Sequence, residues 1–349
     1  MIFKKIKIKG KIFSNRVSVS PMCQYSAIKG MPDQWHYRHL SNLVESGAGS
    51  LTVESTAVSK QGRITRKDLC IYNQKHMRSH KKLLKYLKNI RNIPIILQLS
   101  HSGRKGSAEI PWIKKNTPLK NPFSWKTCAP SKIKRDYKWP FPDEMSNKSI
   151  KKTIKDFKNS AKLAFKAGYD GVEIHIAHGY LLHQFFSPLT NKRIDEYGLN
   201  DKLKYRIHIE IVKSIKNISK DKILGARVTG TDHLLNGSNS KDCIDLVKKL
   251  KKHGLDYICV SSGGIIPKTN MKIKNGFRVS LATRIKKECK ILTRTSGMIN
   301  DFKLIDKILR QKKLDFVAVG RKFISDKFFL IKNSKKKKKH TPHQYTYCF

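Results

Sequence analysis

The sequence predicts an α/β protein in which one chain closes a single (β/α)₈ barrel. Three observations support this fold class: short apolar or β-branched runs recur eight times along the 349 residues, stretches with helical periodicity separate them, and glycines end several of those stretches. Strands buried on both faces are typical of a parallel sheet, and eight of them close such a barrel. The chain lacks both G-x-x-x-x-G-K-[ST] and G-x-G-x-x-G, so neither a P-loop nor an ordinary dinucleotide-binding turn is supported.

Eight predicted strands follow one another along the chain. They cover Arg16 to Ser20, Ser50 to Glu54, Pro94 to Leu99, Gly171 to Ile176, Ile223 to Thr229, Asp256 to Ser261, Lys290 to Thr295 and Asp315 to Val319. In a barrel of this kind the chemistry lies at the carboxyl ends of the strands and in the loops that follow them. Those positions are therefore where functional residues are expected.

The stretches between the strands have the spacing of amphipathic helices. The clearest one carries apolar residues at alternating steps of four and three, namely Ile150, Ile154, Phe157, Ala161 and Ala164. Phe302, Ile305 and Ile308 repeat the pattern later in the chain. Gly47, Gly168 and Gly254 each follow a helical stretch and precede a strand, which is where a left-handed helix stop is expected.

Two parts of the chain fall outside the regular alternation. The longer one, Ser102 to Asn147, follows the third predicted strand and holds three of the four tryptophans, Trp112, Trp125 and Trp139. We expect it to form a lid or rim over the mouth of the barrel. The other is the Lys-rich end, residues 335–349, which is expected to be a solvated tail beyond a barrel domain of residues 1–334.

The net charge of +49, from 74 Lys and Arg against 25 Asp and Glu, raises the question of a nucleic-acid partner. However, only 16 of the basic residues are arginine, and lysine occurs together with abundant Ile and Asn, as AT-rich codons would supply. Lysines also crowd the predicted helices, as in Lys248-Lys249-x-Lys251-Lys252. We expect a compositional origin and no specific nucleic-acid partner, because a binding face would need a pattern of Arg and aromatic contacts.

Seven scattered cysteines without a C-x-x-C pair indicate a reducing compartment, and we expect a cytoplasmic protein. The first residues interrupt their apolar positions with lysines and lack a signal-peptide core. Apolar runs all fall short of the roughly 18 residues of a membrane span, so no membrane partner is expected.

Several strand ends carry residues that suit a polar ligand. Cys23 and Tyr25 follow the first strand, although a cysteine alone is more often a packing group than a reactive one. Gln98 lies in the third strand, where a buried amide needs hydrogen-bond partners. Arg227 stands in the apolar fifth strand and implies an anionic partner, because a buried guanidinium is otherwise costly.

The fourth strand leads into the strongest local signal, His175-x-x-His178-Gly179-Tyr180. Two histidines and a tyrosine at the mouth of a barrel can bind a carbonyl oxygen and donate a proton. The alternative is zinc binding, but a third ligand at another strand end is not evident and no metal is expected. The seventh and eighth strands end in Ser296-Gly297 and Gly320-Arg321, where barrels commonly bind phosphate.

With these residues in view, the sequence resembles the Old Yellow Enzyme family of FMN-dependent ene-reductases, in its bacterial class with a cysteine near the flavin. The resemblance runs from about Ile12 to Tyr345. The motifs that carry it are Ser20-Pro21-Met22-Cys23, Gln61-Gly62-Arg63, Gln98 to Lys105, His175-x-x-His178-Gly179-Tyr180-Leu181, Ser187 to Gly198 and Gly320-Arg321.

The resemblance implies a role for each of these residues. FMN would be held by Ser20, Pro21, Met22, Cys23, Ala57 and Gln98, by Arg227 near the flavin N1, and by Gly297, Gly320 and Arg321 at the phosphate. Cys23 would tune the flavin potential rather than act as a nucleophile. His175 and His178 would bind the substrate oxygen, Tyr25 would help to close the pocket, and Tyr180 would be the proton donor.

The resemblance also implies an NADPH dehydrogenase of the ene-reductase type. Hydride would come from NADPH, or from NADH, and would reach the C=C bond of an α,β-unsaturated carbonyl or related electron-poor compound. The family forms homodimers and homotetramers, and we expect one of these. The alternative is an FMN barrel that reduces uridine in tRNA, but its cysteine donor and helical RNA-binding domain are not evident here. Tyr347 and Ser296 depart from the residues that relatives have at these places, which bears on the subunit contact and on the size of the pocket.

Overall fold

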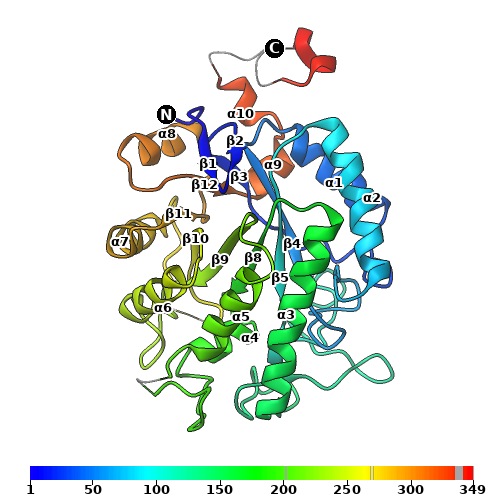
Figure 1. Ribbon diagram of the computed structural model, residues 1–349, viewed down its shortest axis with the longest axis vertical. Helices are drawn as coiled ribbons and strands as arrows, with labels where there is room; N and C mark the ends of the chain where they lie inside the picture. The colour runs from blue at the N-terminus through cyan, green and yellow to red at the C-terminus, as the bar shows by residue number, and fades with distance from the viewer. Residues whose placement is uncertain (201–202, 268, 270, 335–340, 349) are drawn as a thin grey trace.

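The computed structural model describes residues 1–200, 203–267, 269, 271–334 and 341–348, and its strands form the centre of the molecule (Figure 1). One sheet holds eight parallel strands in the order β12-β3-β4-β5-β8-β9-β10-β11. Their bounds are β3 Val17–Val19, β4 Ser50–Ala57, β5 Ile95–Ser100, β8 Gly171–Ile176, β9 Ile223–Thr229, β10 Tyr257–Ser261, β11 Leu292–Thr295 and β12 Val317–Val319. All eight predicted strands are thus confirmed, most of them to within two residues of each end.

The sheet closes into a barrel because its two outer strands approach each other. The first strand of the barrel along the chain, β3, pairs with the last, β12, through Val17 and Val317. Between β11 and β12, the amide of Asp315 donates to the carbonyl of Thr293 (3.1 Å), and the Asp315 carboxylate accepts from the Thr293 amide (2.9 Å). The predicted (β/α)₈ barrel is therefore confirmed.

Helices surround the strands in Figure 1. They are α1 Gln34–Glu45, α2 Gln74–Ile90, α3 Asn147–Ala167, α4 Leu181–Phe186, α5 Arg206–Lys216, α6 Ser240–Lys252, α7 Val279–Cys289, α8 Phe302–Arg310, α9 Arg321–Ser325 and α10 Phe329–Lys332. In α3 the predicted apolar stripe is buried, Ser146 caps the first turn, and Gly168 ends the helix at φ 106°. The caps and the stripe together explain why this 21-residue segment is helical.

An N-terminal hairpin, which the sequence analysis did not predict, packs against the strands inside the barrel. Its strands are β1 Ile6–Ile8 and β2 Lys11–Phe13. The side chains that form this cluster are Ile6, Ile8, Phe13, Ile96, Ile223, Tyr257 and Phe316. Because most of the barrel residues in the cluster lie at the start of their strands, the hairpin covers the end of the barrel opposite the predicted site.

The predicted insert separates β5 from α3. It contains η1 Gly103–Lys105, β6 Cys128–Ala129 and β7 Asp143–Glu144. Trp139 is buried within it, whereas Trp112 is exposed. At the other end of the chain, the lysine run Lys335 to Lys339 lies outside the described residues, and η2 His343–Cys348 follows it.

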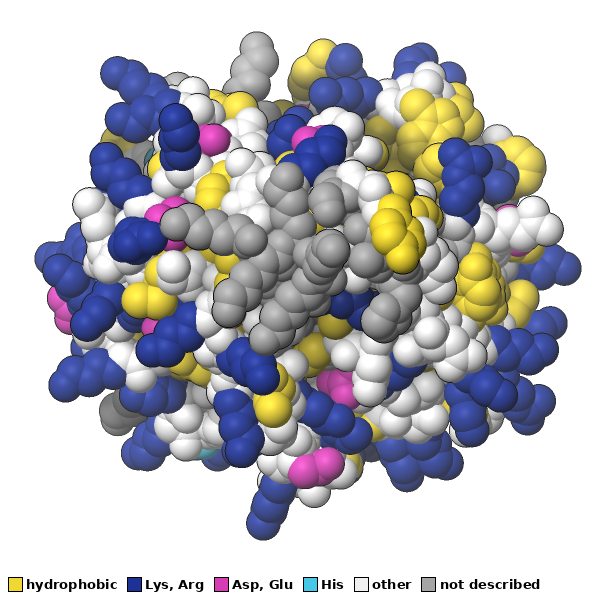
Figure 2. Space-filling model, turned by 90° about the horizontal axis from the view of Figure 1, so that it is seen from above, with side chains coloured by type: hydrophobic (Ala, Val, Ile, Leu, Met, Phe, Trp, Pro, Cys, Tyr) yellow, Lys and Arg dark blue, Asp and Glu magenta, His cyan; other side chains and the backbone are white. Residues whose placement is uncertain are grey.

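The positive charge is spread over the surface. On the face shown in Figure 2, Lys and Arg side chains are distributed all around, with few Asp and Glu side chains between them. On α6, Lys248, Lys251 and Lys252 are exposed in this way. Of the helices in the described residues, none combines the length and the apolar character that crossing a membrane requires.

Candidate functional site

The carboxyl ends of β3 and β12 bring two predicted motifs together. The Ser20 amide donates to the Val319 carbonyl (2.8 Å). A methyl group added at Gly320 would lie 3.2 Å from the Met22 sulfur, which shows how closely the two motifs pack. The predicted residues Ser20, Met22 and Gly320 therefore lie on one wall of a common cavity.

This cavity has a volume of about 550 Å³, and its floor and walls come from four strand ends. Of the predicted cofactor-binding residues it is lined by Ser20, Met22, Arg227, Gly297, Gly320 and Arg321. Arg278 and Lys322 also line it, although the sequence analysis did not single them out. Arg278 immediately precedes α7, in a loop that no motif marks, so the sequence carried no signal for it.

The donor set of this cavity fits a phosphorylated cofactor. Arg227 donates from Nη2 to the Ser296 hydroxyl (3.0 Å), while its buried Nε has no partner among the described residues. Arg278 donates to the Ser262 hydroxyl (3.0 Å) and the Ser296 carbonyl (3.3 Å). Burial and the neighbouring Arg227 lower the pKa of Arg278 to about 10. Neither arginine forms an ion pair with a carboxylate in the described part of the chain, so an anion such as the FMN phosphate would complete the cavity.

Gly297 widens this cavity at the point where the chain leaves β11. Its φ is 138°, and an added methyl carbon would lie 2.9 Å from the Phe277 ring. A side chain here would close the space between Ser296 and Phe277. The predicted position of Gly297 at the phosphate is consistent with this open backbone.

Gln98 and Ala57 lie on the strands next to this cavity, and both are already bonded. Gln98 is buried in β5 and donates from Nε2 to the Glu173 carboxylate (2.9 Å). Ala57 is the last residue of β4, so the predicted end of this strand at Glu54 was wrong. A register shift between Val53 and Thr56 accompanies the extension. The Ala57 amide donates to the Leu69 carbonyl (2.8 Å), and the Ala57 carbonyl accepts from the Ile71 amide (3.1 Å).

The two predicted histidines lie together at the end of β8. The Ala177 amide donates to His175 Nδ1 (3.2 Å), which places the imidazole proton of a neutral His175 on Nε2. That nitrogen lies 3.2 Å from His178 Nδ1, and His178 Nε2 lies 2.7 Å from the Ser261 hydroxyl. Burial, and next the charge of Arg227, lowers both histidine pKa values well below their usual range. Both rings are therefore neutral, and each has one N–H to donate.

The turn after β8 fixes the direction of these side chains. His178 and Gly179 both have positive φ, 58° and 72°. A methyl group on Gly179 would lie 2.2 Å from the Gly264 carbonyl oxygen, so only glycine fits. The Gly179 amide donates to His183 Nδ1 (2.7 Å), and His183 Nε2 lies 2.9 Å from the Asp232 carboxylate. This buried pair, absent from the predicted set, anchors the turn.

Tyr180 follows the turn and faces both His175 and Lys105. Its ring lies edge-on to His175 at 4.9 Å, and Lys105 Nζ lies 5.1 Å from the ring centre. Burial raises the Tyr180 pKa, so its hydroxyl remains protonated at neutral pH. Burial and the nearby Arg135 and Arg104 lower the Lys105 pKa to about 7, and its ammonium donates to the His178 carbonyl (2.7 Å).

Cys23 and Tyr25 share a packing cluster with Tyr180. Both pack with Tyr180 against a small buried cluster of Ile64, Ala108 and Trp139. Burial, and next Glu54 and Asp68, raises the Cys23 pKa, so the group is a neutral thiol. A thiol in this state is a poor nucleophile, which agrees with the expected modulating role.

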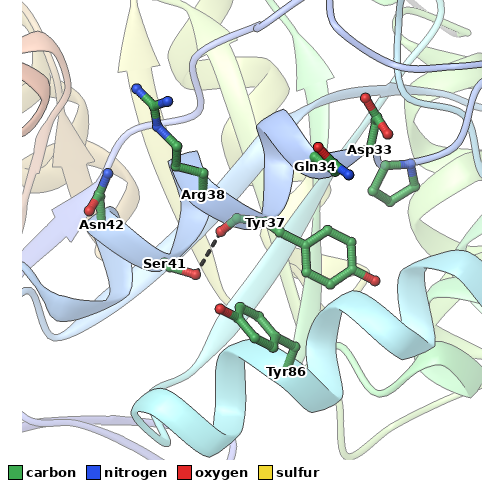
Figure 3. Close-up of a pocket in the computed structure, with 8 residues that line it drawn as sticks. Asp33, Gln34, Tyr37, Arg38, Ser41, Asn42 and Tyr86 are labelled. Atoms are coloured by element: carbon green, nitrogen blue, oxygen red, sulfur yellow. Dashed lines mark hydrogen bonds between the residues drawn. The ribbon is translucent and has the colours of Figure 1, made fainter.

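A second cavity of similar size lies away from the predicted site residues. It has a volume of about 560 Å³ and lies between α1 and α2 on the outside of the barrel, where the rings of Tyr37 and Tyr86 meet at 5.3 Å (Figure 3). It contains none of the predicted site residues. Within the described ranges, the search for three or more His, Cys, Asp or Glu side chains able to hold a metal ion found no group.

Comparisons with known proteins extend over nearly the whole chain. The family model described as NADH:flavin oxidoreductase / NADH oxidase matches residues 1–340. NADPH dehydrogenase of Bacillus subtilis (strain 168) is 35% identical over 330 residues, which cover 94% of this chain and 92% of that protein. Among solved structures, morphinone reductase has a TM-score of 0.76 at 22% identity and covers 93% of this chain and 86% of its own.

A complex of 2-naphthoyl-CoA reductase has a TM-score of 0.84 at 21% identity over 94% of this chain. The chain spans about half of that protein, 51% of its length. At these identities the two structures show a shared barrel fold, whereas the sequence matches carry the assignment of a family.

Proposed function

Because the chain belongs to the NADH:flavin oxidoreductase / NADH oxidase family, we propose that it reduces the C=C bond of α,β-unsaturated carbonyl compounds with NADPH. The family is that of Old Yellow Enzyme, and the protein is an FMN-dependent NAD(P)H oxidoreductase. The proposal adds the substrate class and the roles of individual residues. It rests above all on the close placement of His175, His178 and Tyr180 at the end of β8.

FMN, when bound, supplies hydride transfer between the nicotinamide and the substrate. Ser20, Met22, Arg227, Gly297, Gly320, Arg321 and Arg278 would hold it through the cavity that they line. Pro21, Cys23, Ala57 and Gln98 lie on the adjoining strand ends and complete the proposed set. The remaining chemistry falls to side chains that bind the substrate and hold its proton.

His175 and His178 are proposed to bind the carbonyl oxygen of the substrate. The proton on His175 Nε2 points to His178, and the proton on His178 Nε2 points to Ser261. The carbonyl oxygen of a bound substrate would accept these hydrogen bonds in place of His178 and Ser261. Because negative charge develops on that oxygen as hydride reaches the β-carbon, donors aimed at it stabilise the transition state more than the bound substrate.

Tyr180 is proposed to hold the proton for the α-carbon. Its raised pKa keeps the hydroxyl protonated, and Lys105 beside the ring favours the phenolate that remains after the proton leaves. A tyrosine in this position can deliver its proton without a chain of waters.

The test measures the two half-reactions separately, namely reduction of the enzyme by NADPH and its reoxidation by an enone. Tyr180→Phe, reduced anaerobically with NADPH and then mixed with 2-cyclohexen-1-one, is expected to be reoxidised about 10²-fold more slowly than the wild type. Its reduction by NADPH is expected to stay within about twofold of the wild-type rate. Equal loss in both halves, or a wild-type enzyme that the enone does not reoxidise, would contradict the proposal.

The charge on the face shown in Figure 2 gives no separate support to the tRNA alternative. On the face in Figure 2 the Lys and Arg side chains are dispersed and do not form a stripe that could follow a phosphate backbone. The proposal therefore concerns a small-molecule substrate.

A further inference from the structure

Part of the insert covers the substrate side of the site. Trp139 is 2% exposed and packs in the cluster that Cys23, Tyr25 and Tyr180 contact. Trp112, on another part of the insert, meets the Tyr25 ring edge-on at 5.9 Å. Residues of the insert close to Trp139 therefore lie at the place where a substrate would enter.

Arg135 lies on Trp139 in this entrance. Its guanidinium carbon is 4.6 Å from the centre of the Trp139 ring, and its Nη2 donates to the side-chain oxygen of Asn116 (2.9 Å). None of the ion pairs found among the described residues involves Arg135. The neighbouring carboxylate of Asp136 accepts instead from the Lys138 amide (2.9 Å). Neutral groups therefore hold the Arg135 guanidinium in place, and other N–H groups of the guanidinium remain available to a ligand.

Two further basic side chains near Arg135 likewise take part in none of the ion pairs found among the described residues. Arg104 donates to the carbonyls of Ile133 (3.2 Å) and Lys134 (2.9 Å) from one nitrogen and to that of Ile265 (2.9 Å) from another. Lys105 donates to the His178 carbonyl (2.7 Å). These bonds fix the backbone that carries Arg135, but they compensate no charge.

The electrostatics of this cluster favour an incoming anion. Burial lowers the pKa of Arg135, and burial together with Arg135 lowers that of Arg104 to about 10. Asp136 acts against this lowering in both arginines, but this one carboxylate lies beside the three basic groups Arg135, Arg104 and Lys105, so the cluster keeps a net positive charge that an incoming anion would balance. In addition, Trp139 Nε1 is a buried donor without a partner in the described part of the chain.

We infer that Arg135 binds a carboxylate on the substrate, so that the preferred substrates are unsaturated carbonyl compounds that carry an acid group. The planar fork of arginine matches the two oxygens of a carboxylate. Arg227, Arg278 and Arg321 line the separate cavity assigned to the FMN phosphate, so they leave Arg135 free for this role. The inference rests on the proposed function, whose substrate class it narrows.

The experiment compares an acid with its neutral counterpart in the FMN-loaded enzyme. The substrates are trans-4-oxo-2-pentenoate and its primary amide, which share one carbon skeleton. Arg135→Gln removes the charge, Arg135→Lys restores it without the fork, and Lys138→Gln is the matched control from the same segment. Binding of 4-oxopentanoate, which has no C=C bond to reduce, is measured by calorimetry as a readout independent of turnover.

We expect Arg135→Gln to raise KM for the acid about 10-fold or more and to weaken 4-oxopentanoate binding in parallel. The amide should change less than about twofold, Arg135→Lys should recover part of the loss, and Lys138→Gln should behave as the wild type. Equal effects on acid and amide would overturn the inference. So would a variant that binds 4-oxopentanoate normally but reacts poorly with NADPH, because the anion would then be a phosphate of the nicotinamide cofactor.

The two proposals fail in different ways. If the wild type reduces neither compound while 4-oxopentanoate binding still depends on Arg135, the proposed function is wrong and the carboxylate site stands. If the amide is reduced and Arg135→Gln leaves the acid unaffected, the carboxylate site is wrong and the proposed function stands.

Discussion

Gln98 donates its side-chain amide to Glu173 inside the barrel, with Nε2 2.9 Å from Oε1. The other carboxylate oxygen of Glu173 binds Arg294 Nη2 (2.5 Å) and the Tyr257 hydroxyl (2.9 Å). Glu173 and Arg294 are fully buried. The amide expected to face the flavin is therefore oriented by an ion pair that itself lies within the barrel.

Glu173→Gln should destabilise the fold strongly, because Arg294 would become an unpaired buried charge. We expect a loss of about 3–5 kcal/mol in the free energy of unfolding, measured by urea titration of the FMN-loaded protein. The double variant Glu173→Gln with Arg294→Met removes that charge and should recover most of the loss. A single variant as stable as the wild type would show that the pair contributes nothing.

Arg278→Gln should weaken the binding of FMN but not of riboflavin, because riboflavin lacks the phosphate. We expect the FMN dissociation constant to rise about 10-fold or more, as measured by quenching of flavin fluorescence. Arg284→Gln is the control, since Arg284 is exposed on α7 and bonds to the Ser240 hydroxyl (2.9 Å). Equal weakening for both flavins would place Arg278 away from the phosphate.

Ser261→Ala should free the N–H of His178 for the substrate oxygen. The Ser261 hydroxyl lies 2.7 Å from His178 Nε2, and a substrate oxygen that uses this N–H has to displace the hydroxyl. We expect enone binding to tighten about 2- to 10-fold, the value of one hydrogen bond. Ser262→Ala is the neighbouring control, because Ser262 bonds to Arg278 instead. Weaker binding in Ser261→Ala would mean that Ser261 positions the ring for the substrate.

Gly179→Ala should disrupt the turn that carries His178 and Tyr180. Its control is Gly10→Ala, because Gly10 has a similar φ of 75° with no atom within 4 Å of an added methyl group. We expect about 1 kcal/mol of destabilisation at Gly10, the cost of the backbone conformation alone. At Gly179 the clash with Gly264 adds to this, and enone reduction should fall as well. Equal thermal shifts in the two variants would contradict this account.

The stability of the protein should decrease in acid because several histidines are buried in the neutral form. Burial lowers the pKa of His80 to about 3 and those of His101 and His208 to about 4. Below pH 6.5 the unfolded chain binds protons that the folded chain excludes, so stability is complete above that pH and falls between about 6.5 and 4. Each histidine contributes a slope of about 1.4 kcal/mol per pH unit.

His80→Gln should reduce the pH dependence of the free energy of unfolding by the contribution of one histidine. The measurement is urea unfolding at pH 7.5, 6 and 5. His253→Gln is the control, because His253 is the partly exposed C-cap of α6, whereas His80 is fully buried. An unchanged slope in His80→Gln would show that His80 is protonated in the folded protein.

The barrel could be predicted from the sequence because its signals are local. Strands such as Gly171–Ile176 and Ile223–Thr229 are short segments rich in apolar and β-branched residues, and Gly168 marks the helix stop before the first of them. The hairpin of Ile6–Ile8 and Lys11–Phe13 escaped prediction because its strands are three residues long and interrupted by lysines.

The candidate site was predictable only in part. His175, His178 and Tyr180 lie close in sequence and were expected to act together. The hydrogen-bonded chain from His175 through His178 to Ser261, however, forms only because the fold brings the end of β10 near the residues that follow β8. Arg278 and Arg135 come from loops without a motif. Their positions follow from contacts with Ser262 and Trp139 that only the folded chain brings together.

Because Val17–Val19 pairs with Val317–Val319, this part of the barrel cannot form until almost the whole chain has been synthesised. A ribosome releases the N-terminal strand first, yet the strand that completes its pairing is made almost last. Throughout that interval one edge of β3 exposes unpaired backbone groups, which is the kind of edge that other chains can join. Newly made chains are therefore at greatest risk of aggregation just before the last strand emerges.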